Sequence, residues 1–228
     1  FYIKIFLFDE ETDDFEKKEY VLPSGKLIKL PPFMKPNYVY SKNPDDYMKL
    51  AQISWSIVKI FVDYDNTTRV VSCSKPLLFN IYRHPSQYKS SKFHKIGVNE
   101  FKHGVSFSYV YSLFKQDLEK CQVISGYSVG FDINTLNAEC VKNKIGDVGI
   151  HKNKEVWDVL LLYCAEYNIK IWPKLSECFN TLNKYDDKIK TDWHSADWDV
   201  YATFYVLRHL INKCESDSSD DCLFICED

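Results

Sequence analysis

The chain has 228 residues, a formal net charge of −3 and 45% hydrophobic residues, which is the composition of an ordinary globular protein. This length suits one large α/β domain or two small ones. No apolar run approaches the ~18 residues of a transmembrane helix, and the N-terminus lacks a basic region followed by a small-residue cleavage site. We therefore expect no membrane span and no signal peptide. The weak negative charge does not exclude a nucleic-acid partner, because a cation-filled site and a local lysine patch are sufficient.

Eight cysteines are spread along the chain at wide spacings, and none forms a Cys-x-x-Cys pair. A zinc centre needs Cys and His at short, regular spacings, so we expect none here. In the absence of a secretory signal, cysteines are usually reduced. These features favour an intracellular protein, either cytoplasmic or nuclear.

Three strands are expected in the first half of the chain, at residues 2–8, 50–63 and 68–82. The first is nearly continuously apolar, as in a buried central strand. Pro76 makes the second half of the third run an edge strand or no strand at all. The polar, proline-rich residues 13–47 predict a long connection, with a hairpin around Pro23 and Gly25.

The second half of the chain is mainly helical in its apolar periodicity. We expect helices at 106–120, 131–141, 156–167, 175–182 and 195–211, and a short strand at 123–127. Strands followed by helices with one more strand predict an α/β fold with a mixed sheet and helices on both faces. We expect one domain over residues 1–213, and a disordered acidic tail over 214–228.

Asp9 and Glu11 directly follow the first apolar run. Side chains alternate along a strand, so these two carboxylates project to the same side at its end. Like charges held that close repel each other unless a cation lies between them, and carboxylate oxygens suit Mg²⁺ or Mn²⁺. A solvated acidic turn is the alternative, since Glu10, Asp13 and Asp14 are acidic too.

Two further aspartates lie near predicted helix starts. Asp132 follows the turn 126–130, where Ser128 or Gly130 can cap the helix, and the helix dipole alone would favour an acid there. Asp158 stands near the start of the helix expected at 156–167, where we interpret it as a structural capping residue.

His194 and Asp199 are five residues apart near the last helix. On one continuous helix they would point roughly 140° apart and would not share a site. A helix that starts near Ser195 leaves His194 on the entering loop, from which it can reach over Asp199. The spacing alone is weak evidence, because a lone histidine before a helix is usually only a neighbour of the cap.

Together these segments resemble the DEDDh family, the DnaQ-like 3′→5′ exonucleases of the RNase H-like superfamily. The stretch 8–12 is similar to the family's Asp-x-Glu-Thr motif, 127–132 to its His-Asn-x-x-Phe-Asp motif, and 194–199 to its His-x-Ala-x-x-Asp motif. The segments 50–54, 93–98 with Gly104, and 157–158 are also similar to family segments. The resemblance covers residues 2 to about 212.

The resemblance implies an RNase H-like fold and a two-metal mechanism with Mg²⁺ or Mn²⁺. Asp9, Glu11, Asp132 and Asp199 would bind two ions about 3.5–4 Å apart, and His194 would be the general base. Thr12 and Glu10 would lie beside the terminal nucleotide of a single-stranded or 3′-terminal nucleic acid. The product would be a 5′-mononucleotide.

The chain departs from the family pattern at Tyr127 and Ser128, which replace His-Asn, at Glu10, and in the long insertion 13–47. A binding module that keeps the nuclease fold, such as an accessory subunit of a polymerase or of a replication or repair complex, is the alternative function. A structural acidic protein without a site is a third. The choice between DNA and RNA is left open, since it depends on contacts to the 2′-OH. The richness in Lys, Asn, Tyr, Ile and Phe is typical of AT-rich genomes, such as those of parasites and large DNA viruses.

Overall fold

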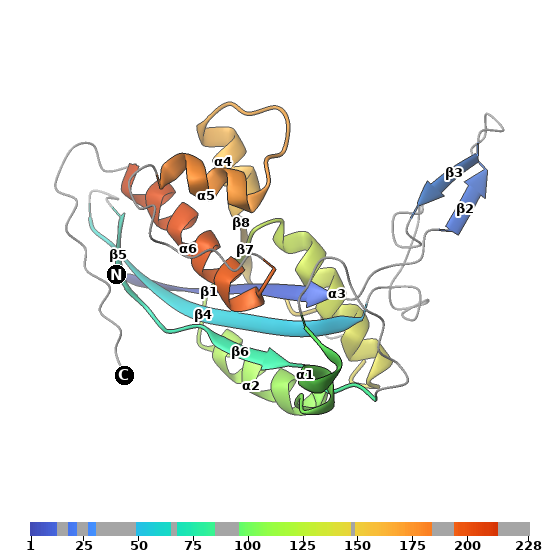
Figure 1. Cartoon of the computed structure of the whole chain (residues 1–228). Coiled ribbons are helices and arrows are strands. Elements are labelled where there is room, and N and C mark those ends of the chain that lie inside the picture. Colours follow the sequence, from blue (N-terminus) through green and yellow to red (C-terminus); the bar gives the residue numbers. More distant parts are fainter. Residues whose placement is uncertain are drawn as a thin grey trace.

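The structure is a computed structural model that describes residues 1–12, 49–64, 68–84, 96–146, 149–183 and 194–213, together with the backbone of two short strands within 13–48. A mixed sheet lies at its centre (Figure 1). The strands follow the order β5-β4-β1-β7-β8, and β6 also pairs with β4. They are β1 (Tyr2–Thr12), β4 (Leu50–Val62), β5 (Thr68–Cys73), β6 (Leu77–Asn80), β7 (Val123–Gly126) and β8 (Glu155–Asp158).

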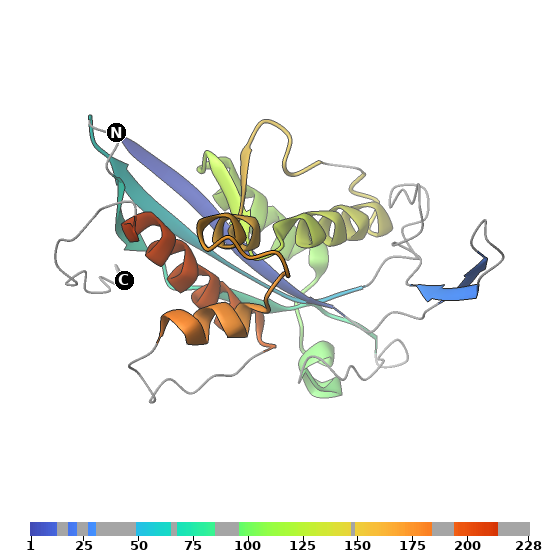
Figure 2. The same ribbon diagram turned by 90° about the horizontal axis from the view of Figure 1, so that it is seen from above.

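Helices cover both faces of this sheet. They are α1 (Val98–Lys102), α2 (Phe107–Glu119), α3 (Val129–Lys142), α4 (Val159–Glu166), α5 (Leu175–Leu182) and α6 (Ala196–Lys213). The helices α2 and α3 pack on one face, and α4, α5 and α6 pack on the other (Figure 1 and Figure 2). Strand β4 is antiparallel to β1, whereas β7 is parallel to β1. The expected mixed α/β sheet with helices on both faces is confirmed.

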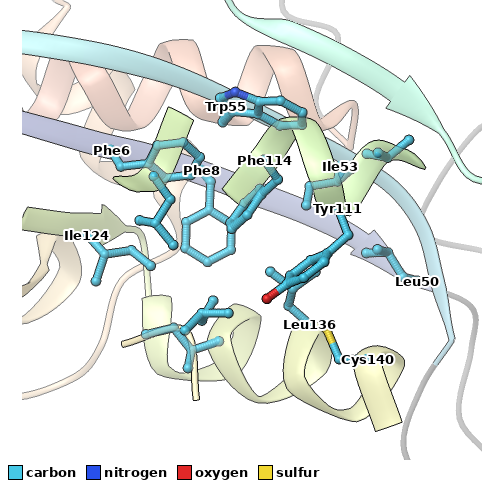
Figure 3. Packing of buried hydrophobic residues seen from close by; sticks show 14 of the residues in the cluster. Phe6, Phe8, Leu50, Ile53, Trp55, Tyr111, Phe114, Ile124, Leu136 and Cys140 are labelled. Carbon is cyan, nitrogen blue, oxygen red and sulfur yellow. The ribbon is translucent and has the colours of Figure 1, made fainter. Parts of the chain in front are cut away.

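Side chains of β1 alternate between the two halves of the core, as strand geometry requires. Phe6 and Phe8 join the aromatic cluster under α2, where the Phe6 and Phe114 rings lie 4.7 Å apart edge to face (Figure 3). Ile5 and Leu7 pack instead with α6. The same alternation continues through the acidic end of β1. It directs Asp9 and Glu11 toward α6, and Glu10 toward α3.

The predicted strands are found close to their expected positions. The run 50–63 is β4, and 68–82 divides at Pro76 into β5 and β6, which both pair with β4. The first strand runs four residues further than expected, to Thr12, because the acidic residues continue the pairing with β4. The motif around Asp9 therefore lies within a strand and does not follow it.

One helix prediction was wrong at its start. Residues 155–158 form β8, which pairs in parallel with β7, and α4 begins only at Val159. Helix α3 begins two residues earlier than expected, at Val129, with Ser128 as its N-cap. The short helix α1 was not predicted. The helices expected at 106–120, 175–182 and 195–211 are confirmed as α2, α5 and α6.

The hairpin expected in the long connection is confirmed by its two strands. β2 (Lys18–Val21) and β3 (Leu27–Leu30) pair antiparallel and lie apart from the main sheet (Figure 1). Residues 22–26, the family-like segment 93–95 and the expected tail 214–228 lie outside the described residues. No helix in the described ranges is long and apolar enough to span a membrane. The cysteines at 73, 121, 140, 164 and 178 are free thiols.

Candidate metal-binding site

Four carboxylates from three elements meet at the C-terminal end of β1. Asp9 and Glu11 come from the strand, Asp132 from the first turn of α3 and Asp199 from the first turn of α6. Glu11 and Asp132 are buried, with 8% and 4% of their surface exposed, and Asp9 and Asp199 are half-buried. The negative charges of Asp132, Asp199 and Glu11 all act on Asp9. The fold therefore brings together the four carboxylates singled out in the sequence.

Burial and mutual repulsion make these carboxyls weak acids. Burial raises the pKa of Asp9 well above its usual range, and the three neighbouring charges raise it further. Burial, with the charge of Asp199, raises the pKa of Glu11 to about 8. Burial also raises the pKa of Asp199 to about 7, although a hydrogen bond from the backbone of His194 opposes this. Without a cation, the cluster holds protons near neutral pH.

This proton uptake predicts an unusual pH dependence of stability. The folded pKa of Glu11, about 8, lies above its ordinary value of 4.5, so the folded chain binds more protons between these pH values. The free energy of unfolding should therefore be highest at acidic pH and fall as pH rises from about 4.5 to about 8. Thermal unfolding in EDTA across this range measures the slope, and saturating Mn²⁺ should flatten it.

Two variants isolate the contribution of Glu11. Glu11→Gln should show a shallower decline in melting temperature than the wild type. Glu119→Gln should keep the wild-type slope, because Glu119 is exposed, lies outside the carboxylate cluster and pairs with Lys115 at 3.7 Å. Equal slopes for Glu11→Gln and the wild type would show that the burial of Glu11 does not control the titration.

The histidine of the third motif lies at the same place. One ligand atom from each of Glu11, His194 and Asp199 can be chosen such that all three lie within 4.8 Å of one another. His194 has a φ of 72°, in the left-handed region, and α6 begins two residues later. This turn leaves the exposed imidazole outside the helix, which removes the angular separation that a continuous helix would impose.

Two buried carboxylate oxygens of the cluster lack a hydrogen-bond donor within the described chain. Asp132 Oδ2 and Asp199 Oδ1 are buried and have no hydrogen-bond partner among the residues described. A buried carboxylate oxygen without a donor is costly, and a divalent cation removes that cost. An all-oxygen ligand set with a nearby imidazole suits Mg²⁺ or Mn²⁺. The residues present therefore fit such an ion.

The entry to α3 is held by Asp158. Its Oδ1 accepts hydrogen bonds from the backbone of Leu160 at 3.0 Å and of Ser128 at 3.1 Å. Asp158 thus caps α4, as expected, and also fixes the turn that precedes Asp132. Ser128 takes the N-cap position, as one of the two residues considered for it, with a φ of 60°, but its side chain makes no cap hydrogen bond. The hydroxyl of Tyr127 donates a hydrogen bond of 2.6 Å to the backbone oxygen of Pro173.

Glu10 and Thr12, the two residues expected beside the nucleotide, lie in different surroundings at the end of β1. Glu10 is buried on the α3 side of β1, where the charges of Glu139 and Lys142 act on it. Both of its carboxylate oxygens lack a hydrogen-bond partner among the described residues. Burial raises its pKa well above the usual range. Thr12 is half-buried at the end of β1, beyond a register shift and opposite Leu50. Their contact with a substrate stays a prediction.

Sequence reasoning did not single out Gln52, a long polar side chain beside the site. It lies opposite Glu11 in β4 and is 6% exposed. The signal was present, because Gln52 interrupts the apolar start of the run LAQISW. A polar residue buried in a central strand requires a hydrogen-bond partner, but the sequence does not reveal which one.

Comparisons with known proteins identify the fold. No protein-family model matches the chain, and no curated protein matches it either. Among solved structures, the RNase domain of the yeast Pop2 protein is similar with a TM-score of 0.51 and 11% identity, over 93% of this chain and 77% of that one. Exonuclease X in complex with 5′-overhanging duplex DNA matches with a TM-score of 0.46 and 11% identity, over 93% and 94%. The six-stranded mixed sheet flanked by helices is an RNase H-like fold.

Proposed function

We propose that this protein is a metal-dependent 3′→5′ exonuclease that releases 5′-mononucleotides from DNA or RNA. The observation that carries the proposal is the convergence of Asp9, Glu11, Asp132 and Asp199 from β1, α3 and α6. Two of these carboxylates have buried oxygens without a partner in the described residues. A structural acidic turn would expose its charges to water and would not bury them beside one another.

Each residue has a defined role in this proposal. Asp9, Glu11 and Asp199 would hold one divalent ion, and Asp9 with Asp132 would hold the second. The ions would lower the pKa of the attacking water and stabilise charge on the attacking and leaving oxygens. His194 accepts the proton of the attacking water, and it is well placed because it is exposed beside Glu11 and Asp199.

The fold agrees with this chemistry. The similar yeast structure is an RNase domain, which supports nucleic acid as the substrate class. Phosphodiester hydrolysis needs a site that binds a polyanion despite its own carboxylates, and bound cations satisfy that need. The release of mononucleotides and the 3′→5′ direction come from the motif resemblance and are tested directly.

The test uses matched DNA and RNA oligonucleotides labelled at the 5′ end, each with a free or a phosphate-blocked 3′ end. With Mn²⁺ we expect stepwise shortening from the free 3′ end, slower attack on blocked ends, and loss of activity in EDTA that added Mn²⁺ reverses. Full turnover in metal-free buffer would contradict the metal-dependent mechanism. Tight binding of the oligonucleotide without cleavage would instead indicate a binding module that keeps the nuclease fold.

A further inference from the structure

We propose that Gln52 is a positioning residue that holds the N-terminus of α6, and with it Asp199 and His194, against Glu11. The metal-binding part of this inference rests on the proposed function, whereas its structural part does not. Figure 1 shows α6 lying over β1 and β4, so the helix start and the acidic end of β1 meet on one face of the sheet.

Strand pairing places Gln52 beside the metal-binding cluster. In the antiparallel pair of β1 and β4, Gln52 lies directly opposite Glu11. Directly opposed residues of an antiparallel pair project to the same face, with Cβ atoms about 5 Å apart. Gln52 therefore shares with Glu11 the face that α6 covers.

The side chain of Gln52 bonds to the first residue of α6. Its Oε1 accepts a hydrogen bond of 2.8 Å from the backbone N–H of Ala196, and this contact is buried. The first N–H groups of a helix have no partner within the helix and need one from outside. Here that partner comes from a strand 144 residues earlier in the chain. The bond thus ties the start of α6 to the sheet beside Glu11.

Asn80 fixes the orientation of the Gln52 amide. Gln52 Nε2 donates to Asn80 Oδ1 at 2.7 Å, and Asn80 lies directly opposite Gln52 in β6. With its NH₂ group held by β6, the amide turns its oxygen toward Ala196. Both ends of the buried amide are satisfied, and three segments of the chain are joined at one point.

A movement of Ala196 would also move Asp199 and His194, because both lie within three residues of it. Asp199 is in the first turn of α6, and its backbone N–H bonds to Ser195 O at 3.0 Å. His194 precedes the helix by two residues. A helix start released from Gln52 would move both side chains relative to Glu11, and loss of such supporting contacts typically lowers metal affinity about 10–100-fold.

The test compares Gln52→Met with Gln122→Met. Gln122 is the control, because its side chain makes a similar bond elsewhere. Its Oε1 accepts a hydrogen bond of 2.8 Å from the backbone N–H of Lys4, at the other end of β1 and away from the carboxylates. We expect Gln52→Met to weaken Mn²⁺ binding about 10–100-fold in a titration of the folded protein. Gln122→Met should stay within about twofold of the wild type. If Gln52→Met lowers only the melting temperature and binds Mn²⁺ like the wild type, the inference is overturned.

Asn80→Ala is a milder variant. It also tests whether Asn80 acts on Ala196 through Gln52, which we call the relay. It should weaken Mn²⁺ binding less than Gln52→Met does, because Gln52 can still reach Ala196. In the double variant its effect should disappear, since Asn80 acts through Gln52. Fully additive effects of the two substitutions would contradict the relay.

Hydrogen exchange separates this inference from the proposed function. The amide of Ala196 should exchange faster in Gln52→Met than in the wild type, and it should be unchanged in Gln122→Met. If that result is obtained while the wild type binds no Mn²⁺, the positioning role stands and the proposed function fails. Unchanged exchange at Ala196 would overturn the positioning role, whatever the metal titration shows.

Discussion

Asp9→Ala should abolish cleavage while leaving the fold intact. Asp9 is the carboxylate on which the charges of Asp132, Asp199 and Glu11 all act, and we propose that it bridges both ions. Removal of a single donor to a transition state already costs ~10²–10³-fold in rate, so loss of a group that holds two ions should cost at least about 10³-fold. Single-turnover cleavage of a labelled oligonucleotide at saturating Mn²⁺ measures the loss.

The same substitution should not destabilise the metal-free protein. It removes one carboxyl group from a crowded, mutually repelling cluster, so the melting temperature in EDTA should be unchanged or higher at pH 8. The gain that Mn²⁺ gives to the wild-type melting temperature should disappear in Asp9→Ala. Asp63→Ala is the control, because Asp63 is exposed just beyond the other end of β4 and accepts a hydrogen bond of 2.7 Å from the backbone N–H of its neighbour Tyr64. An active Asp9→Ala protein would show that the motif is only an acidic turn.

Local patterns in the sequence were sufficient to predict the part of the site that depends on single elements. Alternation along β1 predicts that Asp9 and Glu11 share a face, and the structure directs both toward α6. A helix start near Ser195 predicts that His194 is on a loop, and α6 begins at Ala196. Both inferences use the geometry of one element only, which the residues of that element determine.

Features that depend on contacts between distant segments could not be predicted. Strand β8 has four residues and is followed directly by α4, so its local sequence pattern predicts the first turn of a helix. Only parallel pairing with β7 makes it a strand. The bond from Ala196 to Gln52 spans 144 residues, and no periodicity encodes such a partner. Alternation directs the side chain of Glu10 to α3, beside Glu139 and Lys142, and its expected place beside the substrate stays a prediction.

His194→Ala should lower the cleavage rate by roughly 10²–10⁴-fold, which is the usual contribution of a positioned general base. The imidazole is exposed and stands outside α6, where water can reach it, so the substitution leaves no cavity in the core. His151→Ala is the matched control, because His151 is exposed in the loop after α3 and belongs to no metal-binding group of the described chain. It should cleave at the wild-type rate.

The comparison with Asp199→Ala decides which role His194 has. Both residues offer an atom within 4.8 Å of Glu11, so geometry alone permits the histidine to be a ligand or a base. As a base, His194→Ala should bind Mn²⁺ nearly as the wild type does and lose only the chemical step. Asp199→Ala should lose Mn²⁺ affinity, because it removes a carboxylate from the cluster. Mn²⁺ titration beside single-turnover rates separates the two effects. Equal losses of metal would make His194 a ligand, and wild-type cleavage by His194→Ala would mean that another group accepts the proton.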